Sequence, residues 1–265
     1  VTIDGTDYFD GKTIFPEDFY RIQAQGTDIK TYHINQYMFR ENFEPYAKAG
    51  DEVLYMCFST GIAGTFNAAN LAKEELLEEY PDFDLTIIDT KCASLGFGLA
   101  VEKILRMQAN GAPKELIIEA AQFFCDHMEH IVTVETLEYL YKGGRLSRTS
   151  AVLGGVLDLK PIIEVNDDGA LVAIEKVRGR HKSLKRCVEL VGERGVDLDK
   201  QIIGVVHGND PETCEKVSAM LMEKYHCRGI IKSWVGCAIG AHTGPGIIGI
   251  VFLSASEEKY AEYLK

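Results

Sequence analysis

The alternation of buried strands and helices in the first half of the chain constrains its fold most strongly. The run EVLYMCFS at 52–59 is almost wholly apolar and a glycine follows it, which is typical of a strand buried on both faces. Successive strands joined by helices pair in parallel, because the crossover needs the length of a helix. The sequence therefore predicts an α/β domain with a parallel sheet. The expected elements are strands at 52–59 and 85–90 and helices at 65–81, 95–110 and 113–128.

The pattern changes near residue 130, where strands begin to outnumber helices. The segment Asn166-Asp167-Asp168-Gly169 stands between two strands as a hairpin turn, which a purely parallel sheet cannot contain. We therefore expect two domains, over 1–130 and 131–265, the second with a mixed sheet and a ligand cleft between the two. The expected elements are strands at 130–136, 161–166, 170–176, 201–207, 229–235 and 247–253 and helices at 149–157, 179–194 and 210–225.

The charge balance excludes several classes of partner. Forty acidic and 28 basic residues leave a net charge of −12, which repels nucleic acids and anionic membrane surfaces. Apolar runs such as 247–253 are much shorter than the roughly 18 residues that a membrane span needs. The opening VTIDGTDYFDG has none of the features of a signal peptide. We expect no nucleic-acid partner, no stable membrane insertion and a monomer.

The seven cysteines indicate the compartment. They are widely spaced, form no CxxC pair and mostly stand in apolar contexts such as 54–58. Free cysteines in such contexts are typically buried and reduced, which favours a reducing compartment. We therefore expect a cytoplasmic protein.

Standard catalytic and metal signatures do not fit. Gly5 and Gly11-Lys12-Thr13 are separated by five residues where a phosphate loop has four, and there is no G-x-S-x-G or H-E-x-x-H motif. His127 and His130, with acidic neighbours, could hold a metal, but a solvated helix end is the favoured interpretation. We expect no metal and no cofactor.

Two polar segments follow the two predicted parallel strands. Ser59-Thr60-Gly61-Ile62-Ala63-Gly64-Thr65 and Asp89-Thr90-Lys91-Cys92-Ala93-Ser94-Leu95-Gly96 each lie between a strand and a helix. Because ligands of open α/β sheets gather at the carboxyl ends of the strands, we expect both to face one crevice and to bind a small anion. The alternative is that Ser59 or Thr65, and Ser94, merely cap helices while Asp89 braces a loop.

Two glycine-rich segments in the second half are further candidates. Gly143-Gly144-Arg145 suggests a tight turn that presents a guanidinium to a carboxylate or phosphate, and the small apolar helix at 151–157 could line a channel or simply pack. In Gly236 to Gly246 we expect a turn between two strands that holds His242 as a hydrogen-bond donor to an anion or as a general base. A histidine that only braces the loop is the alternative.

A run of basic residues interrupts the acidic sequence. It comprises Lys176, Arg178, Arg180, Lys182, Lys185 and Arg186. A solvated helix face is the common outcome for such a run, and docking of an acidic partner is the functional alternative.

Taken in order, these segments resemble the DegV family of bacterial fatty-acid-binding proteins, whose members supply acyl chains to a fatty acid kinase. Ser59 to Thr65 is similar to the family's S-S-x-x-S-G-T block and Asp89 to Gly96 to its D-S-x-x-x-S-x-G block. Gly143-Gly144-Arg145, Lys160-Pro161 and Gly240 to Gly246 look like three further family blocks. Together the blocks extend over nearly the whole chain.

The resemblance implies a two-domain α/β fold, an α/β/α domain with a parallel sheet and an α/β domain with a mixed six-stranded sheet. It implies a lipid between them, with its carboxylate on the hydroxyls and the histidine and its tail in an apolar tunnel. The implied ligand-binding residues are Thr31, Ser59, Thr60, Gly61, Ser94, Gly96 and His242, with His33, Arg145, Gly154 and Gly155 at the pocket or at a partner-docking surface.

The chain departs from the family pattern at three places. The first family strand, which ends in T-D-S, is absent, so we expect the N-terminal domain to lack it. Thr31-Tyr32-His33-Ile34-Asn35 replaces T-S-Q-P-S, and Ala63 replaces a serine. The resemblance implies that Tyr32 or His33 supplies hydrogen bonds that the family takes from serine.

Two functions follow as hypotheses. The first is a non-catalytic carrier that binds a long-chain fatty acid and presents it to a fatty acid kinase for acyl-phosphate formation. The second is an acyl or phosphoryl transferase with His242 as general base and Thr60 or Ser59 as nucleophile. The absence of a recognisable orienting acid, metal set or nucleotide loop favours the carrier.

Overall fold

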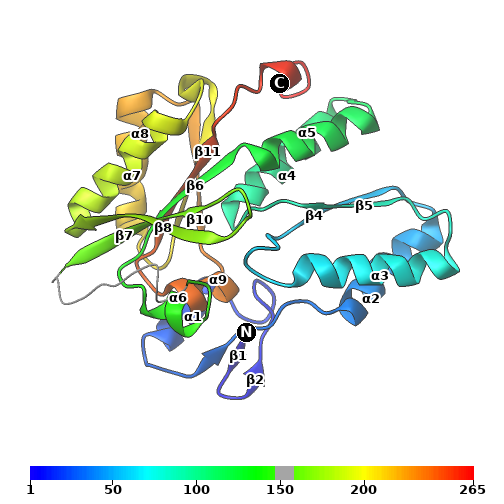
Figure 1. Ribbon diagram of the computed structural model, residues 1–265, viewed down its shortest axis with the longest axis horizontal. Helices are drawn as coiled ribbons and strands as arrows, with labels where there is room; N and C mark the ends of the chain where they lie inside the picture. The colour runs from blue at the N-terminus through cyan, green and yellow to red at the C-terminus, as the bar shows by residue number, and fades with distance from the viewer. Residues whose placement is uncertain (147–157) are drawn as a thin grey trace.

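The computed structural model describes residues 1–146 and 158–265 and contains three sheets (Figure 1). The strands are β1 (Thr2–Ile3), β2 (Thr6–Asp7), β3 (Ile29–Lys30), β4 (Val53–Cys57), β5 (Leu85–Asp89), β6 (Met128–Thr133), β7 (Leu159–Val165), β8 (Leu171–Arg178), β9 (Ile202–His207), β10 (Gly229–Trp234) and β11 (Ile248–Leu253). The helices are α1 (Pro16–Gln23), α2 (Gln36–Ala49), α3 (Thr65–Glu79), α4 (Leu95–Ala109), α5 (Lys114–Asp126), α6 (Glu138–Lys142), α7 (Arg180–Arg194), α8 (Pro211–Tyr225) and α9 (Cys237–Thr243). Two short 3-10 turns lie at Leu198–Lys200 and Glu258–Tyr260.

The largest sheet has six strands in the order β10-β9-β11-β6-β7-β8. Only the pair β9 and β10 is parallel, and the other neighbours are antiparallel, so the sheet is mixed as predicted. Asn166 to Gly169 forms the predicted hairpin turn between β7 and β8, where the Asn166 side chain accepts a hydrogen bond from the Ala170 N–H. A positive φ of 75° at Gly169 explains the glycine at this turn.

Helices cover both faces of this sheet, which explains its continuous apolar strands. In β11 the side chains of Ile248, Ile250 and Phe252 pack with α7 and α8, while Val251 and Leu253 pack with α4 and α5 on the opposite face. All six residues of β11 are buried. Figure 1 shows α7 and α8 on one side of the sheet and α4 and α5 on the other.

The predicted parallel pair β4 and β5 forms a separate two-stranded sheet. Its Tyr55 packs edge-on against Phe39 and Phe43 of α2, and α3 completes that core. Leu54 and Met56, which alternate with Tyr55, join the core around α4 instead. This sheet therefore lies between helix layers, and its carboxyl ends lead into the two polar loops.

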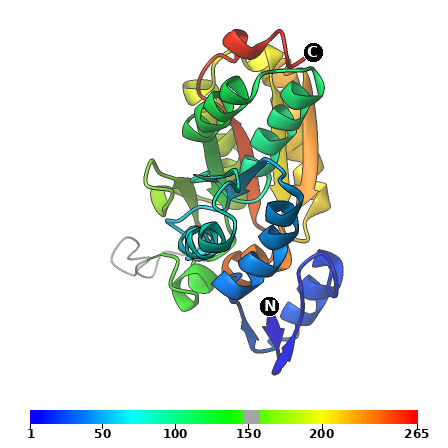
Figure 2. The ribbon, with the colours of Figure 1, turned by 90° about the vertical axis from the view of Figure 1, so that its right-hand side faces the viewer.

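The first 50 residues contain more secondary structure than the sequence pattern predicted. They contain β1, β2, β3, α1 and α2, which were not predicted. Helix α1 packs against α9, and the elements β1 to β3 lie at the opposite end of the molecule from the C-terminus (Figure 2). Short strands and a helix that begins at Pro16 after an exposed phenylalanine give weak periodic signals, so the sequence pattern missed them.

Most other predicted elements are confirmed, with ends shifted by up to three residues. All seven cysteines are free and buried, as expected. The predicted helix at 149–157 lies outside the described residues. In the part of the chain that the structure describes, no helix is long and apolar enough to cross a membrane.

Candidate ligand-binding site

The two polar loops after β4 and β5 are bonded to each other, as the shared edge of a parallel sheet predicts. One oxygen of Asp89 accepts hydrogen bonds from the backbone N–H groups of Thr60 and Lys91, each at 3.1 Å. The Ser59 N–H donates to the Cys92 carbonyl at 3.1 Å. Asp89 thus braces the two loops against each other, which is the role that the sequence left as an alternative.

The Ser59 hydroxyl is fully buried and is used inside the protein. It donates to the carbonyl of Gly169 at 2.6 Å and accepts from the Gly61 N–H at 3.2 Å. A Cβ at Gly61 would lie 2.5 Å from the Gly169 carbonyl carbon, so glycine at 61 permits this close approach. The tip of the β7–β8 hairpin is therefore bonded to the first polar loop, and we call this contact between Ser59 and Gly169 the hairpin latch. No sequence pattern indicates this partner, because the contact depends on the register of a distant hairpin.

Thr60 and Ser94 carry the hydroxyls that remain open. Thr60 is exposed, and Ser94 is the residue just before α4 and makes no side-chain bond to the helix. Neither hydroxyl bonds to another residue within 1–146 or 158–265. The alternative that Ser94 caps a helix is wrong for its side chain. Helix α3 begins at Thr65, after Gly64, and has no side-chain cap, so the capping alternative is wrong there too. Both hydroxyls are free to meet a ligand.

His242 is joined to Thr31 across the molecule. Its Nε2 lies 2.7 Å from the Thr31 Oγ1, while its buried Nδ1 has no hydrogen-bond partner among the described residues. Burial, with a smaller contribution from the Arg145 guanidinium, lowers the pKa of His242 to about 4. The imidazole is therefore neutral near pH 7, and no carboxylate of the described residues orients its Nδ1.

Arg145 links the histidine to the first polar loop. Its Nε donates to the Ile62 carbonyl at 3.2 Å, and its Nη1 donates to the Gly143 carbonyl at 2.7 Å. The His242 ring lies against Gly143, where any Cβ would overlap Nδ1. The Gly143-Gly144-Arg145 turn therefore has two roles: Gly143 leaves room for the imidazole, and Arg145 places a cation beside it.

The prediction of a turn around His242 is wrong, because residues 237–243 form the short helix α9. Position 240 in this helix is a glycine because a Cβ there would lie 2.7 Å from the Tyr20 hydroxyl oxygen. The Gln23 side chain donates to the Gly240 carbonyl at 3.0 Å. Helix α1, which the sequence did not predict, thus explains a glycine that was attributed to a turn.

The segment that replaces the family's T-S-Q-P-S is close to the same loops. Its Thr31 bonds to His242, and the His33 ring lies 3.4 Å from the Cβ position of Gly64. Tyr32 is 46% exposed, so its aromatic ring is open to solvent or to a ligand. Of the predicted pocket residues, Gly154 and Gly155 lie outside the described residues.

The histidine pair offered as a metal candidate does not hold a cluster. His127 ends α5 as expected, but His130 lies in β6 and is only 3% exposed, so a solvated helix end is wrong for it. Across residues 1–146 and 158–265, no group of three or more His, Cys, Asp or Glu side chains could hold a metal ion. The Nε2 of His130 instead accepts a hydrogen bond from Ala93 in the second polar loop.

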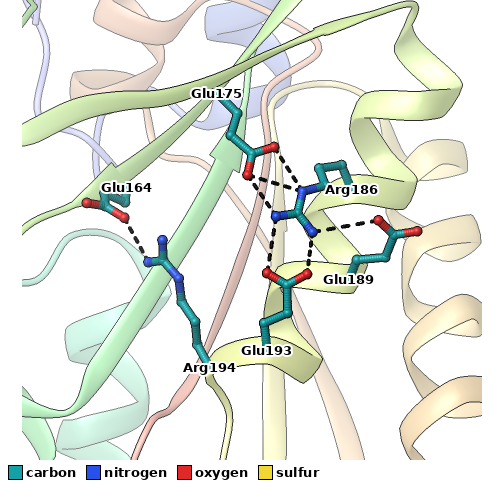
Figure 3. A network of polar contacts seen from close by, with 6 residues as sticks. All are labelled: Glu164, Glu175, Arg186, Glu189, Glu193 and Arg194. Atoms are coloured by element: carbon teal, nitrogen blue, oxygen red, sulfur yellow. Dashed lines mark hydrogen bonds and ion pairs between the residues drawn. The ribbon is translucent and has the colours of Figure 1, made fainter.

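Half of the basic run is neutralised within the protein. Arg186 pairs with Glu175, Glu189 and Glu193, and the nearby Arg194 pairs with Glu164 (Figure 3). Arg180 pairs with Glu135, and Lys185 with Glu189. Arg178 and Lys182 are exposed and pair with no described residue. Of the basic run, only these two cations therefore remain candidates for docking an acidic partner.

A cavity of about 430 Å³ lies at the other end of the molecule and contains none of the predicted site residues. Cations and anions line it together, among them Lys200, Arg228, Asp197 and Glu258, beside the C-terminal segment. It therefore does not match an apolar tunnel for a lipid tail. The chemistry of the hydroxyls, Arg145 and His242 locates the candidate site at the polar loops instead.

Comparison with known proteins shows the family of the chain. The profile of the DegV family, described as a family of uncharacterised proteins, matches residues 1–255. A DegV domain-containing protein of Clostridium perfringens is 37% identical over 258 residues, which cover 97% of this chain and 89% of that protein.

Two solved structures share the fold. A fatty acid binding DegV family protein of Streptococcus agalactiae has a TM-score of 0.81 and 26% identity, over 96% of this chain and 89% of that one. The Fatty Acid Kinase (Fak) B3 protein of Streptococcus pneumoniae, loaded with linoleic acid, has a TM-score of 0.85 and 19% identity over the same shares. With its α/β fold, its small parallel sheet and its six-stranded mixed sheet, the chain belongs to the DegV family.

Proposed function

We propose that this protein binds a long-chain fatty acid whose carboxylate lies at the polar loops. The observation that carries the proposal is that linked segments bear three hydroxyls: Asp89 joins the loops of Thr60 and Ser94, whose hydroxyls have no described partner, and Arg145 connects the first of these loops to His242, which holds Thr31. Hydroxyl donors are suited to a carboxylate, since hydrogen bonds to a charged acceptor are shorter and stronger than neutral ones.

The neutral His242 orients the Thr31 hydroxyl in this proposal. When Nε2 carries the proton it donates to the Thr31 Oγ1, and the Thr31 hydrogen is then free to point at the carboxylate. The unprotonated Nδ1 then faces the turn that holds Arg145, whose positive charge disfavours a second proton on the ring. The histidine thus supplies a directed hydrogen bond instead of a charge.

Arg145 supplies the positive field that an anion needs in a protein of net charge −12. Its guanidinium is part-buried, and two of its N–H groups are fixed by backbone carbonyls. A cation held in this way attracts a carboxylate without requiring the side chain to be reordered on binding. Ser59 serves the site indirectly, because its hydrogen is committed to Gly169.

The tail supplies most of the affinity in this proposal. Burial of each methylene contributes roughly 0.8 kcal/mol, so a long acyl chain outweighs a few hydrogen bonds at the head group. The sequence prediction that the small apolar segment 151–157, with Gly154 and Gly155, lines a channel for the tail concerns residues outside the described part of the chain. The head group then selects an acid, and the tail provides binding strength.

We further propose that the protein is a carrier for a fatty acid kinase and catalyses no reaction itself. The fold shared with the Streptococcus pneumoniae protein named for that kinase supports this proposal. So do two exposed cations that an acidic surface of the kinase would fit, Arg178 at the end of β8 and Lys182 in the first turn of α7. The seven buried thiols support a location in the reducing cytoplasm.

Labelled oleate tests the binding proposal directly. Oleate carrying carbon-13 at its carboxyl group is expected to give a single shifted NMR signal when it is mixed with the protein. On acidification, the bound carboxylate is expected to take up a proton at a lower pH than the carboxylate of free oleate does. A carboxyl signal at the free position, with the acyl chain bound or unbound, would place the head group elsewhere or show that no acid binds.

A further inference from the structure

His130 is a buried histidine that belongs to the six-stranded sheet but touches the second polar loop. It lies in β6, opposite Val251 of β11, and is 3% exposed. Its Nε2 accepts a hydrogen bond from the Ala93 N–H at 3.2 Å, and its Nδ1 lies 3.2 Å from the Met128 carbonyl. Because a backbone N–H can only donate and a carbonyl can only accept, Nε2 carries no proton and Nδ1 does. These two contacts fix a neutral imidazole in one tautomer and one orientation.

The same ring explains the glycine that ends the loop. A Cβ at Gly96 would overlap the His130 Nε2 and would lie 2.6 Å from its Cε1. Glycine at 96 therefore lets the imidazole lie directly on the backbone of α4. The next glycine in the helix, Gly98, is different, since its Cβ would meet only the Leu95 side chain at 3.4 Å.

Ser94 stands between the two residues that His130 contacts. The Gly96 N–H donates to the Ala93 carbonyl at 2.9 Å, so Ala93 is held at both of its backbone polar groups. Ser94 itself has φ 51° and ψ −130°, a backbone conformation that residues with a Cβ adopt only when their surroundings enforce it. The contacts on either side of Ser94 are the surroundings that do so.

We infer that His130 is a positioning residue for the head-group site, because its neutral imidazole fixes Ala93 and Gly96 and thereby sets where the Ser94 hydroxyl points. The inference rests on the proposed fatty-acid binding and names the residue that gives the second polar loop its geometry. A histidine suits this position because it combines an acceptor for the loop with a donor for its own strand at opposite sides of one flat ring.

The test compares oleate binding by His130→Phe and His130→Gln. Phenylalanine keeps a ring over Gly96 but removes the acceptor for Ala93, whereas the glutamine side-chain oxygen can accept at nearly the same place as Nε2. We expect His130→Phe to bind oleate about tenfold more weakly, the cost of one misplaced hydrogen bond to a charged group. We expect His130→Gln to bind within about threefold of the unmodified protein.

A double-mutant cycle with Ser94→Ala separates positioning from general destabilisation. If His130 acts through Ser94, His130→Phe is expected to add little in the Ser94→Ala background, because the hydroxyl that it positions is already gone. Full additivity of the two effects would overturn the inference. So would unaltered affinity in a folded His130→Phe protein.

Gly96→Ala provides a second arm that leaves His130 in place, should His130→Phe fold poorly. It is expected to weaken oleate binding through the overlap with the imidazole, whereas Gly98→Ala, its control in the same helix, is not. Equal affinities for these two variants would overturn the inference. If the unmodified protein binds no oleate, the proposed function fails first and the positioning role falls with it, so the two failures are told apart.

Discussion

The Thr31 Oγ1 and the His242 Nε2 lie 2.7 Å apart although 211 positions separate the two residues in the sequence. Thr31 follows the short strand β3, and His242 is part of helix α9 near the end of the chain. The bond therefore joins the N-terminal segment to the last part of the fold at the candidate site. It also makes the Thr31 hydroxyl dependent on the protonation state of His242.

Thr31→Val removes this hydroxyl with little change in volume. We expect oleate affinity to fall about tenfold, because a donor to the carboxylate is lost and the His242 Nε2 is left without a partner. Thr31→Ser keeps the hydroxyl and is expected to stay within about threefold of the unmodified protein. Titration of both variants with oleate by calorimetry measures the difference, and equal loss in the two variants would remove Thr31 from the head-group site.

Gly169→Ala and Gly111→Ala form a matched pair for the hairpin latch. Both glycines have a positive φ, 75° and 78°, so alanine costs about 1 kcal/mol of backbone strain at either position. At Gly169 a Cβ would also overlap the Ser59 hydroxyl and lie 3.2 Å from the Lys91 Cα, whereas at Gly111 no described atom lies within 4 Å. We expect Gly169→Ala to lower the free energy of unfolding by a further 1–3 kcal/mol or so. Urea unfolding of the pair checks this, and equal losses would show that the latch contributes nothing to stability.

The stability of the protein is expected to fall as the solution is acidified from pH 6.5 to pH 4. Burial lowers the pKa of His130 to about 4, below the usual 6.5 that it regains on unfolding, so the unfolded chain binds a proton before the folded one does. The stability that this neutral histidine contributes is complete above pH 6.5 and is lost toward pH 4, by about 3 kcal/mol. Urea unfolding at several pH values measures the slope. His130→Gln is expected to reduce the slope and to leave the part that comes from His242, whose pKa burial also lowers to about 4. An unchanged slope in that variant would show that His130 does not contribute.

Arg178 and Lys182, the two cations that pair with no described residue, are expected to matter for transfer to a kinase and not for binding of the lipid. Arg178→Glu with Lys182→Glu reverses both charges, so an acidic partner surface would be repelled and acyl-phosphate formation by a fatty acid kinase is expected to fall tenfold or more, roughly. Lys216→Glu with Lys224→Glu on α8 makes the same change in net charge and serves as the control. If both double variants slow transfer alike, net charge and not this surface is the cause.

The sequence predicted the parts of the fold that are set by local pattern. The apolar strands β4, β5 and β11 and the long amphipathic helices carry strong sequence signals, and the Asn166 to Gly169 turn is a local hairpin signal. Burial on both faces is complete for β11, whereas β4 and β5 are mostly half-buried. The elements before β4 were missed because β1, β2 and β3 have two residues each, too few to show alternation. Their positions depend on contacts with α9, far along the chain.

For the candidate site, the sequence indicated segments that lie together but not what each side chain contacts. The bonds from Asp89 to both loops and the contact between Arg145 and Ile62 confirm that the segments around Ser59, Asp89 and Arg145 meet. The use of the Ser59 hydroxyl by Gly169, and of the Gly96 space by His130, could not be predicted, because each depends on a side chain delivered by a separate sheet. Close approaches of this kind explain glycines that a sequence pattern can only mark as special.

Mass spectrometry of lipid extracted from the purified protein tests the central claim most directly. A carrier that buries a long acyl chain is expected to retain it through purification, so the extract should contain about one fatty acid per chain in a saturated sample, since each methylene adds roughly 0.8 kcal/mol. The Thr31→Val protein prepared in parallel should retain less. An extract without fatty acid, together with a protein that takes up none when oleate is added, would contradict the proposed function.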